Sequence, residues 1–288
     1  RHQGKAPSTG EFGATSHPGL RAHFVYQPEA EASWRYVFTA HTCFGLGGAF
    51  VANWHWQDPI EDIFPCGVLL ADGAPRDRFY GYRNAGVLFR QIRPRYRAPE
   101  VFFVIPTSHR FGARQHEIEK AMVRGLCSLL GVHVEVGTVD EEQLDTLPSA
   151  ARVLIWPVPY CPSDEAYARV LEFVRRGGAL CLSGDVSYGP DRRRTRTRRL
   201  EELCGVRFVA ERYPNIEYHA GEGGEARAET DDPLARTIAA SGLTAPCIEV
   251  EPTESQVLAR AGGVPLAVLN RVGAGRVLYL TDPAELHS

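Results

Sequence analysis

At 288 residues the chain suits about two domains. Its composition, 44% hydrophobic and 23% charged, is that of an ordinary globular protein and excludes disorder, collagen and coiled coil. No apolar run reaches the roughly 18 residues of a membrane helix, so no membrane partner is expected. Lysine and arginine number 32 against 35 acidic residues, and the net charge of -3 does not favour binding of nucleic acid.

The seven cysteines form no CxxC pair, are odd in number, and in several cases lie inside apolar runs, as Cys181 does. This pattern favours buried free thiols over a disulfide framework or a zinc site, so neither a metal nor a cofactor is expected. Free cysteines favour the cytoplasm. The chain begins at Arg1, without an initiator methionine or a signal-peptide pattern, so it is expected to be a piece of a longer protein whose compartment stays open.

Apolar residues recur at helical spacing over residues 28–43 and predict the first helix. Glycines at 45, 47 and 48 end it, and residues 49–52 are then predicted as a buried strand. A helix that leads into a continuously apolar strand indicates an α/β layer with a parallel sheet. Two prolines within residues 93–99 indicate an extended linker, and the predicted domains are residues 1–97 and 98–288.

Beyond the linker, short apolar strands alternate with helices and indicate a doubly wound, flavodoxin-like sheet. Ser163 is the expected N-cap of the second helix of this region, because a serine hydroxyl accepts hydrogen bonds from the first helical turn. Residues 265–270 and 276–280 predict a hairpin, and the polar, glycine-rich segment 216–232 receives no assignment. The predicted strands are 101–105, 132–136, 152–156 and 179–183, and the predicted helices are 116–130 and 164–176.

Glu11 stands in the motif Gly-Glu-Phe-Gly at residues 10–13. A carboxylate at the end of a barrel strand is where a (β/α)8 enzyme places a nucleophile, whereas a lone loop glutamate is by default solvated. Downstream, the apolar strand runs into Asn-Trp-His-Trp-Gln-Asp at residues 53–58. Indole rings suit the apolar CH faces of a sugar and amides bind hydroxyls, so Asn53, Trp54 and Trp56 are the expected substrate contacts.

Here the motifs resemble a known family. Residues 10–13, the helix that follows and residues 47–56 resemble strands seven and eight of the clan A glycoside hydrolases, and residues 58–90 resemble the last turn and helix of that barrel. The remainder resembles the trimerisation domain of family 42 β-galactosidases, most clearly at residues 177–185 and 270–279. The resemblance covers nearly the whole chain. It implies an α/β fold class: the last strands and helices of a TIM barrel, followed by a flavodoxin-like, class I amidotransferase-like doubly wound domain.

By this resemblance Glu11 is the nucleophile of a retaining glycoside hydrolase that acts on O-glycosidic bonds of a carbohydrate substrate, as a β-galactosidase does. In the family the acid/base glutamate follows an asparagine at the end of strand four, which would lie before Arg1. The isolated chain is therefore expected to be inactive, and if it were active, Asp58 and Glu61 would be the first candidates for a second carboxylate. The resemblance also implies a homo-oligomer, namely a trimer. The sequence departs from the family pattern at residues 54–57, which leaves the sugar open.

Aromatic residues near these motifs also have structural interpretations. Trp54 and Trp56 share strand parity, so they face the same side of the strand, and each either fills the core or forms a platform for a sugar ring. His55 is expected to be structural, and His17 and His23 are expected to lie in a solvated loop.

Two further features of the sequence resemble functional sites. Six arginines occupy the eight positions from Arg192 to Arg199. No aromatic residue interleaves them, which favours a solvated loop or a contact with an acidic subunit over nucleic-acid binding. Cys161 and Cys181 lack the Gly-x-Cys-x-Gly turn of an amidotransferase nucleophile. The alternative function, from another class, is a non-catalytic flavodoxin-like oligomerisation or interaction module.

Overall fold

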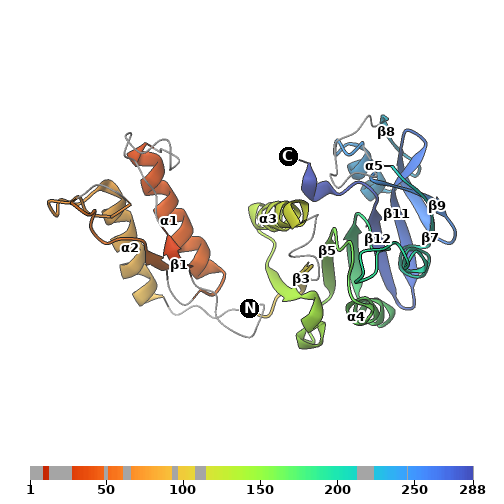
Figure 1. The fold of residues 1–288 in the computed structure, drawn as a ribbon, viewed down its shortest axis with the longest axis horizontal. Helices are drawn as coiled ribbons and strands as arrows, with labels where there is room; N and C mark the ends of the chain where they lie inside the picture. Colours follow the sequence, from red (N-terminus) through yellow and green to blue (C-terminus); the bar gives the residue numbers. More distant parts are fainter. Residues whose placement is uncertain are drawn as a thin grey trace. The chain divides into compact units, whose positions relative to one another are not determined.

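The computed structural model of the chain describes residues 9–12, 28–48, 51–60, 66–92, 97–107, 115–212, 224–244 and 246–287. The chain divides into two compact units, with the boundary between residues 97 and 98 (Figure 1). In the described parts of both units, every helix is too short or too polar to cross a membrane.

The first unit has the element order strand, helix, strand, helix. These elements are β1 (Thr9–Phe12), α1 (Glu29–Gly45), β2 (Val51–Asn53) and α2 (Asp77–Gln91). Strands β1 and β2 pair in parallel, as the apolar pattern predicted. Helix α1 confirms the first predicted helix, and Ala32, Tyr36 and Ala40 form its buried stripe. Residues 49 and 50 of the predicted strand lie outside the described residues.

The two helices of the first unit pack closely against each other. A Cβ at Gly81 of α2 would lie 2.6 Å from Cγ2 of Val37, so the glycine permits this approach. Further along the pair, the rings of Phe44 and Phe89 stack with centroids 4.0 Å apart. The core of the unit lies under the helices and contains Ala32, Tyr36 and Val68.

The second unit is built on an eight-stranded sheet of order β4-β3-β5-β6-β12-β11-β10-β8. Neighbours from β4 to β12 are parallel, and the pairs beyond β12 are antiparallel. The parallel part has the flavodoxin-like order 2-1-3-4-5 counted from β3, which confirms the predicted fold class of this unit. The strands are β3 (Val101–Ile105), β4 (Val136–Asp140), β5 (Val153–Pro157), β6 (Ala179–Ser183), β8 (Ala226–Ala228), β10 (Gln256–Ala261), β11 (Val264–Val272) and β12 (Gly275–Leu280).

Helices cover both faces of the parallel part (Figure 1). Helix α3 (Gln115–Gly131) packs on one face, where the ring of Phe103 lies against Gly125. Helix α4 (Asp164–Arg175) packs on the other face, against Leu154 and Leu180 in the main core. Burial on both faces explains why these strands are continuously apolar in sequence.

The remaining elements of the second unit surround this sheet. Strands β7 (Val206–Glu211) and β9 (Ile248–Pro252) form a separate antiparallel pair. The short helices are η2 (Glu141–Thr146), η3 (Leu200–Cys204), α5 (Pro233–Ala239) and η4 (Ala284–Leu286). Strand β8 falls in the polar segment to which the sequence pattern gave no assignment.

Most predicted elements of this unit are confirmed, and one is wrong. Strands β3 and β6 have the predicted bounds, Ser163 accepts a hydrogen bond from the Ala166 N–H as the N-cap of α4, and β11 and β12 form the predicted hairpin. The strand predicted at residues 132–136 begins only at Val136. Residues 132–134 instead donate their N–H groups to the last carbonyls of α3, with His133 at a φ of 59°. These amides terminate the helix and are unavailable to a strand.

Candidate functional site

The carboxyl ends of β1 and β2 lie side by side in the first unit. Phe12 is the partner of Asn53 in the pairing register, and the Trp54 N–H donates to the Phe12 carbonyl at 2.7 Å. Glu11 directly precedes Phe12, so the backbone brings this predicted residue next to Asn53 and Trp54. The side chain of Glu11 lies outside the described residues.

The strand register is irregular at Glu11. Thr9 pairs with Val51 and Phe12 pairs with Asn53, so β1 uses one more residue than β2 between these two pairs. The additional residue lies at position 10 or 11. Such bulges are common at barrel rims and next to active sites, where they redirect a side chain.

Asn53 is the last residue of β2 and holds the following turn. Its Nδ2 donates to the carbonyl of His55, whose φ of 65° is unusual for a residue other than glycine. The Oδ1 atom is enclosed and has no hydrogen-bond partner among the described residues. The amide therefore keeps an acceptor for which the described part of the chain supplies no donor.

The two tryptophans lie beyond the strand and have different neighbours. Trp54 is 40% exposed and its ring lies 4.9 Å from that of His55, whereas Trp56 is 56% exposed and meets the ring of Phe79 edge-on at 5.8 Å. The predicted strand parity is wrong, because β2 ends at Asn53 and the left-handed backbone of His55 breaks the alternation. Among the described residues of the first unit both indoles are exposed rather than packed in its core.

Asp58 braces the loop that carries both tryptophans. Its Oδ1 accepts the Gly67 N–H at 2.7 Å, and its Oδ2 pairs with Arg76. The backbones are joined as well, because the Asp58 N–H donates to the Leu69 carbonyl and the Leu69 N–H donates to the Trp56 carbonyl, both at 3.0 Å. A carboxylate that is 6% exposed and engaged at both oxygens is structural, which argues against Asp58 as a second catalytic group. Glu61, His17 and His23 lie outside the described residues.

A buried arginine anchors this brace to both helices. Arg78 of α2 is fully buried, and its Nε and Nη2 donate to the Glu29 carboxylate of α1 at 2.9 and 2.5 Å. Burial lowers the pKa of Arg78, but the hydrogen bond and charge of Glu29 outweigh it and raise the pKa above its usual value. Arg76 lies 3.8 Å from the same carboxylate and so links Asp58 to this pair. Sequence reasoning missed Glu29 and Arg78 as a pair, since a charged residue in a helix is by default assigned to solvent.

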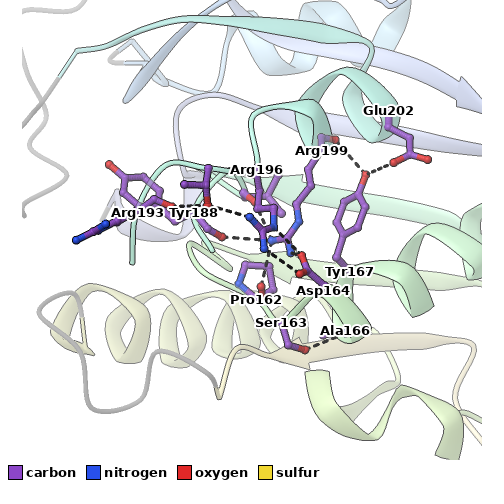
Figure 2. A network of polar contacts seen from close by, with 12 residues as sticks. Pro162, Ser163, Asp164, Ala166, Tyr167, Tyr188, Arg193, Arg196, Arg199 and Glu202 are labelled. Carbon is purple, nitrogen blue, oxygen red and sulfur yellow. Dashed lines mark hydrogen bonds and ion pairs between the residues drawn. The ribbon is translucent and has the colours of Figure 1, made fainter. Parts of the chain in front are cut away.

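The arginine run of the second unit divides into two sets. Arg199 is 4% exposed and pairs with Asp164, and its Nη1 donates to the carbonyls of Pro162, Val186 and Tyr188 at 3.1 to 3.4 Å (Figure 2). The ring of Tyr167 lies 4.9 Å from its guanidinium carbon. Within the same run Arg194 pairs with Asp185 at 2.6 Å and with Glu211 at 3.1 Å. The interpretation as a solvated loop is wrong for these two arginines. It holds for Arg192, Arg193 and Arg198, which are exposed, and for Arg196, whose side chain is 38% exposed and forms a surface ion pair with Asp164.

The two cysteines considered as nucleophiles are poorly suited to that role. Burial raises the pKa of Cys161 to about 11 and that of Cys181 to about 12, so neither thiol ionises appreciably near neutral pH. None of the seven cysteines forms a disulfide. No cluster of three or more metal-ligating side chains occurs in the described ranges.

The fold of the chain is similar to part of several glycoside hydrolases. A β-galactosidase of the haloarchaeon Halorubrum lacusprofundi matches 98% of this chain at a TM-score of 0.68 and 15% identity, over 42% of its own length. An exo-β-1,4-mannosidase of Opitutaceae bacterium strain TAV5 matches 96% at 0.65 and 18% identity, over 47% of its length. A GH42 β-galactosidase of G. stearothermophilus matches 86% at 0.65 and 15% identity, over 37% of its length. The sequence matches no protein-family model and no curated protein.

The chain thus spans less than half the length of these enzymes. At such low identity the similarity concerns the fold, and both units take part in it, since nearly the whole chain is covered. The resemblance inferred from the motifs is supported at this coarse level, because the fold is similar to part of β-galactosidases and of a mannosidase.

Proposed function

We propose that the chain is the C-terminal part of a retaining glycoside hydrolase, in which residues 1–97 supply barrel strands seven and eight and Glu11 is the nucleophile. The observation that carries this proposal is the adjacency of β1 and β2, whose carboxyl ends bring Glu11 next to Asn53 and Trp54. In (β/α)8 enzymes the active site lies at this end of the strands. The register shift beside Glu11 supports the proposal, because a bulge there redirects a side chain.

The residues that follow β2 suit a sugar. Trp54 and Trp56 present exposed indole faces, which pack against CH groups, and Asn53 lies beside them at the end of β2. The brace at Asp58 holds this loop in place, so the platform is pre-organised for binding. The solved neighbours include β-galactosidases and a β-mannosidase, and the proposed substrate class is therefore a β-linked hexoside.

Substitution of the nucleophile tests this function. In the complete enzyme, E11Q should abolish turnover of aryl β-galactosides and β-mannosides, because a neutral amide cannot form the glycosyl-enzyme intermediate. Azide should partly restore activity to E11A by occupying the vacated position. E31Q is the matched control, since it neutralises an exposed glutamate of α1 that forms only a surface ion pair with Arg35. An E11Q enzyme that keeps nearly the wild-type rate would rule out Glu11 as the nucleophile and favour the non-catalytic interaction module.

The 288-residue chain alone is expected not to hydrolyse glycosides. The acid/base carboxyl is proposed to lie outside it, and general acid assistance contributes roughly 10²–10⁴ in rate. Release of nitrophenol from aryl glycosides by the purified chain measures this directly. Turnover that depends on Glu11 would mean that a second carboxylate within the chain completes the site.

The second unit is proposed to serve assembly. Burial raises the pKa of Cys161, in the loop after β5, and of Cys181 in β6, which favours a structural role over amidotransferase chemistry. Self-association, as a trimer by the family resemblance, is the expected outcome of light scattering on the purified chain. A monomer at high concentration would exclude the assembly role.

A further inference from the structure

The segment after β12 lies across helix α3. We call residues 282–287, which include η4, the strap. Nη1 of Arg124 in α3 donates to the carbonyl of Leu286 at 2.8 Å, so helix and strap are joined by a hydrogen bond. The Leu286 side chain packs with Met122 against a buried cluster of Ile118, Ala121 and Val158. The strap therefore docks through one apolar residue and a few polar contacts.

Glu285 points its carboxyl group into this contact. Its Oε2 atom is enclosed and has no hydrogen-bond partner in the described part of the chain. The Ser183 hydroxyl of β6 and the backbone N–H of Glu285 face the carboxyl and act to lower its pKa. Gly125 of α3 makes room for it, because a Cβ at that position would lie 3.1 Å from Cγ of Glu285. A carboxyl group is thus held between helix, sheet and strap with one oxygen unsatisfied.

The charges around Glu285 do not compensate for its burial. Desolvation raises the pKa of Glu285 above its usual value, and the carboxylate of Asp282 adds to the rise, while Ser183 and His287 oppose it. His287 is paired with Asp282, Nε2 to Oδ1, at 2.5 Å. From β6, Cys181 faces the carboxyl as a neutral thiol, and from α3, Arg124 is engaged with the Leu286 carbonyl. In the described ranges no arginine or lysine forms an ion pair with Glu285.

We propose that the strap is a pH-sensitive latch, docked on α3 while the Glu285 carboxyl is neutral and weakened in its docking as that carboxyl ionises. The docked state holds the proton more tightly than the released state. Docking is therefore strongest below the ordinary pKa of 4.5 and loses stability as the pH rises through the raised pKa. Release would uncover the carboxyl end of β6, the edge at which open α/β sheets bind ligands. The latch does not depend on the proposed glycosidase function.

Hydrogen exchange of the full chain tests the latch. The protection of the strap amides, corrected for the intrinsic exchange rate, is measured between pH 5 and 9. Protection should fall by about tenfold for each unit by which docking raises the pKa of Glu285. The amides of β12 pair with β6 and β11 and serve as the internal reference for global opening. In E285Q, a near-isosteric neutral variant, protection should stay at its acidic value throughout.

Two matched variants distinguish the effect of Glu285 from that of other ionisable groups in the same unit. H287Q removes the imidazole that pairs with Asp282 and should leave the pH dependence in place. E254Q alters an exposed glutamate of the same unit and should behave as wild type. Three results would overturn the latch: constant protection in the wild-type strap, an E285Q strap that keeps the wild-type pH dependence, or a parallel loss of protection in β12.

Discussion

Removal of the Arg199 guanidinium should destabilise the second unit far more than removal of its neighbour Arg196. Both arginines bind the Asp164 carboxylate, Arg199 through Nη2 and Arg196 through Nε and Nη2 at 2.9 and 3.0 Å. They differ in burial, because the side chain of Arg199 is 5% exposed and that of Arg196 is 38% exposed. The pair R199M and R196M therefore separates a buried anchor from a surface ion pair that shares its partner (Figure 2).

The expected loss follows from the groups that Arg199 satisfies. Hydrogen bonds from a charged donor contribute about 1.5–3 kcal/mol each, but three carbonyls share the two hydrogens of one Nη1, so their contributions do not add. The contact with the Tyr167 ring adds about 1 kcal/mol, and the ion pair with the 63% exposed Asp164 adds little. Burial of the guanidinium, which lowers the pKa of Arg199, offsets part of the gain. R199M should therefore cost about 3 kcal/mol.

Thermal unfolding measures this difference. Trp156 is fully buried and is the only tryptophan of the second unit, so it reports on that unit once Trp34, Trp54 and Trp56 are replaced by phenylalanine. At about 3 °C per kcal/mol for a unit of this size, R199M should lower Tm by about 9 °C. R196M should leave Tm nearly unchanged. Equal shifts in Tm for R199M and R196M would refute the argument. They would mean that Arg199 stabilises the unit through Asp164, which both arginines bind, and not through the buried carbonyls.

Three further outcomes are expected. G275A should destabilise the β11–β12 hairpin by about 3 kcal/mol or more, since its Cβ would lie 2.1 Å from the carbonyl oxygen of Val174. Urea unfolding measures this loss, and an unchanged free energy of unfolding would mean that the backbone shifts to relieve the contact. Iodoacetamide should label the exposed Cys127 rapidly and the buried Cys204 only on unfolding, as peptide mass spectrometry can resolve; equal rates would contradict the core assignment. Hydrogen bonds from Arg196 and Arg199 lower the pKa of Asp164 to about 2, so the Tm advantage of wild type over D164N should persist above pH 3.8 and shrink as the pH falls toward 2.

Local patterns of the sequence predict much of the fold. Strands β3 and β6 are short apolar runs bounded by polar or glycine residues, and both were predicted to the residue. The N-cap at Ser163 and the hairpin turn before Gly275 also depend on a few neighbouring residues. The error at residues 132–136 has the same local origin, because a helix terminus and a strand start were both compatible with that apolar stretch.

The candidate site was predictable only in part. An asparagine–tryptophan pair after an apolar run could be assigned to the carboxyl end of a parallel strand. Glu11 lies within β1 and no apolar run precedes it, so its position at the same edge was expected only from the family resemblance. The parity of Trp54 and Trp56 could not be predicted, because it depends on where β2 ends and on the backbone of His55. The ion pair of Glu29 and Arg78, which anchors the Asp58 brace, could not be predicted from the sequence either, because the two residues lie 49 positions apart.

The sequence alone determined the periodicities, caps and turns, and with them the identity and order of most elements. Only the tertiary structure decided which charges are buried. Arg199 and Arg192 stand in one run and are indistinguishable by local pattern, yet one is enclosed among carbonyls and the other is exposed. The physical reason is that helix and strand formation depends on residues a few positions apart. The burial of a charge instead depends on partners brought together by the packing of distant elements, as Asp164 is for Arg199 across 35 positions.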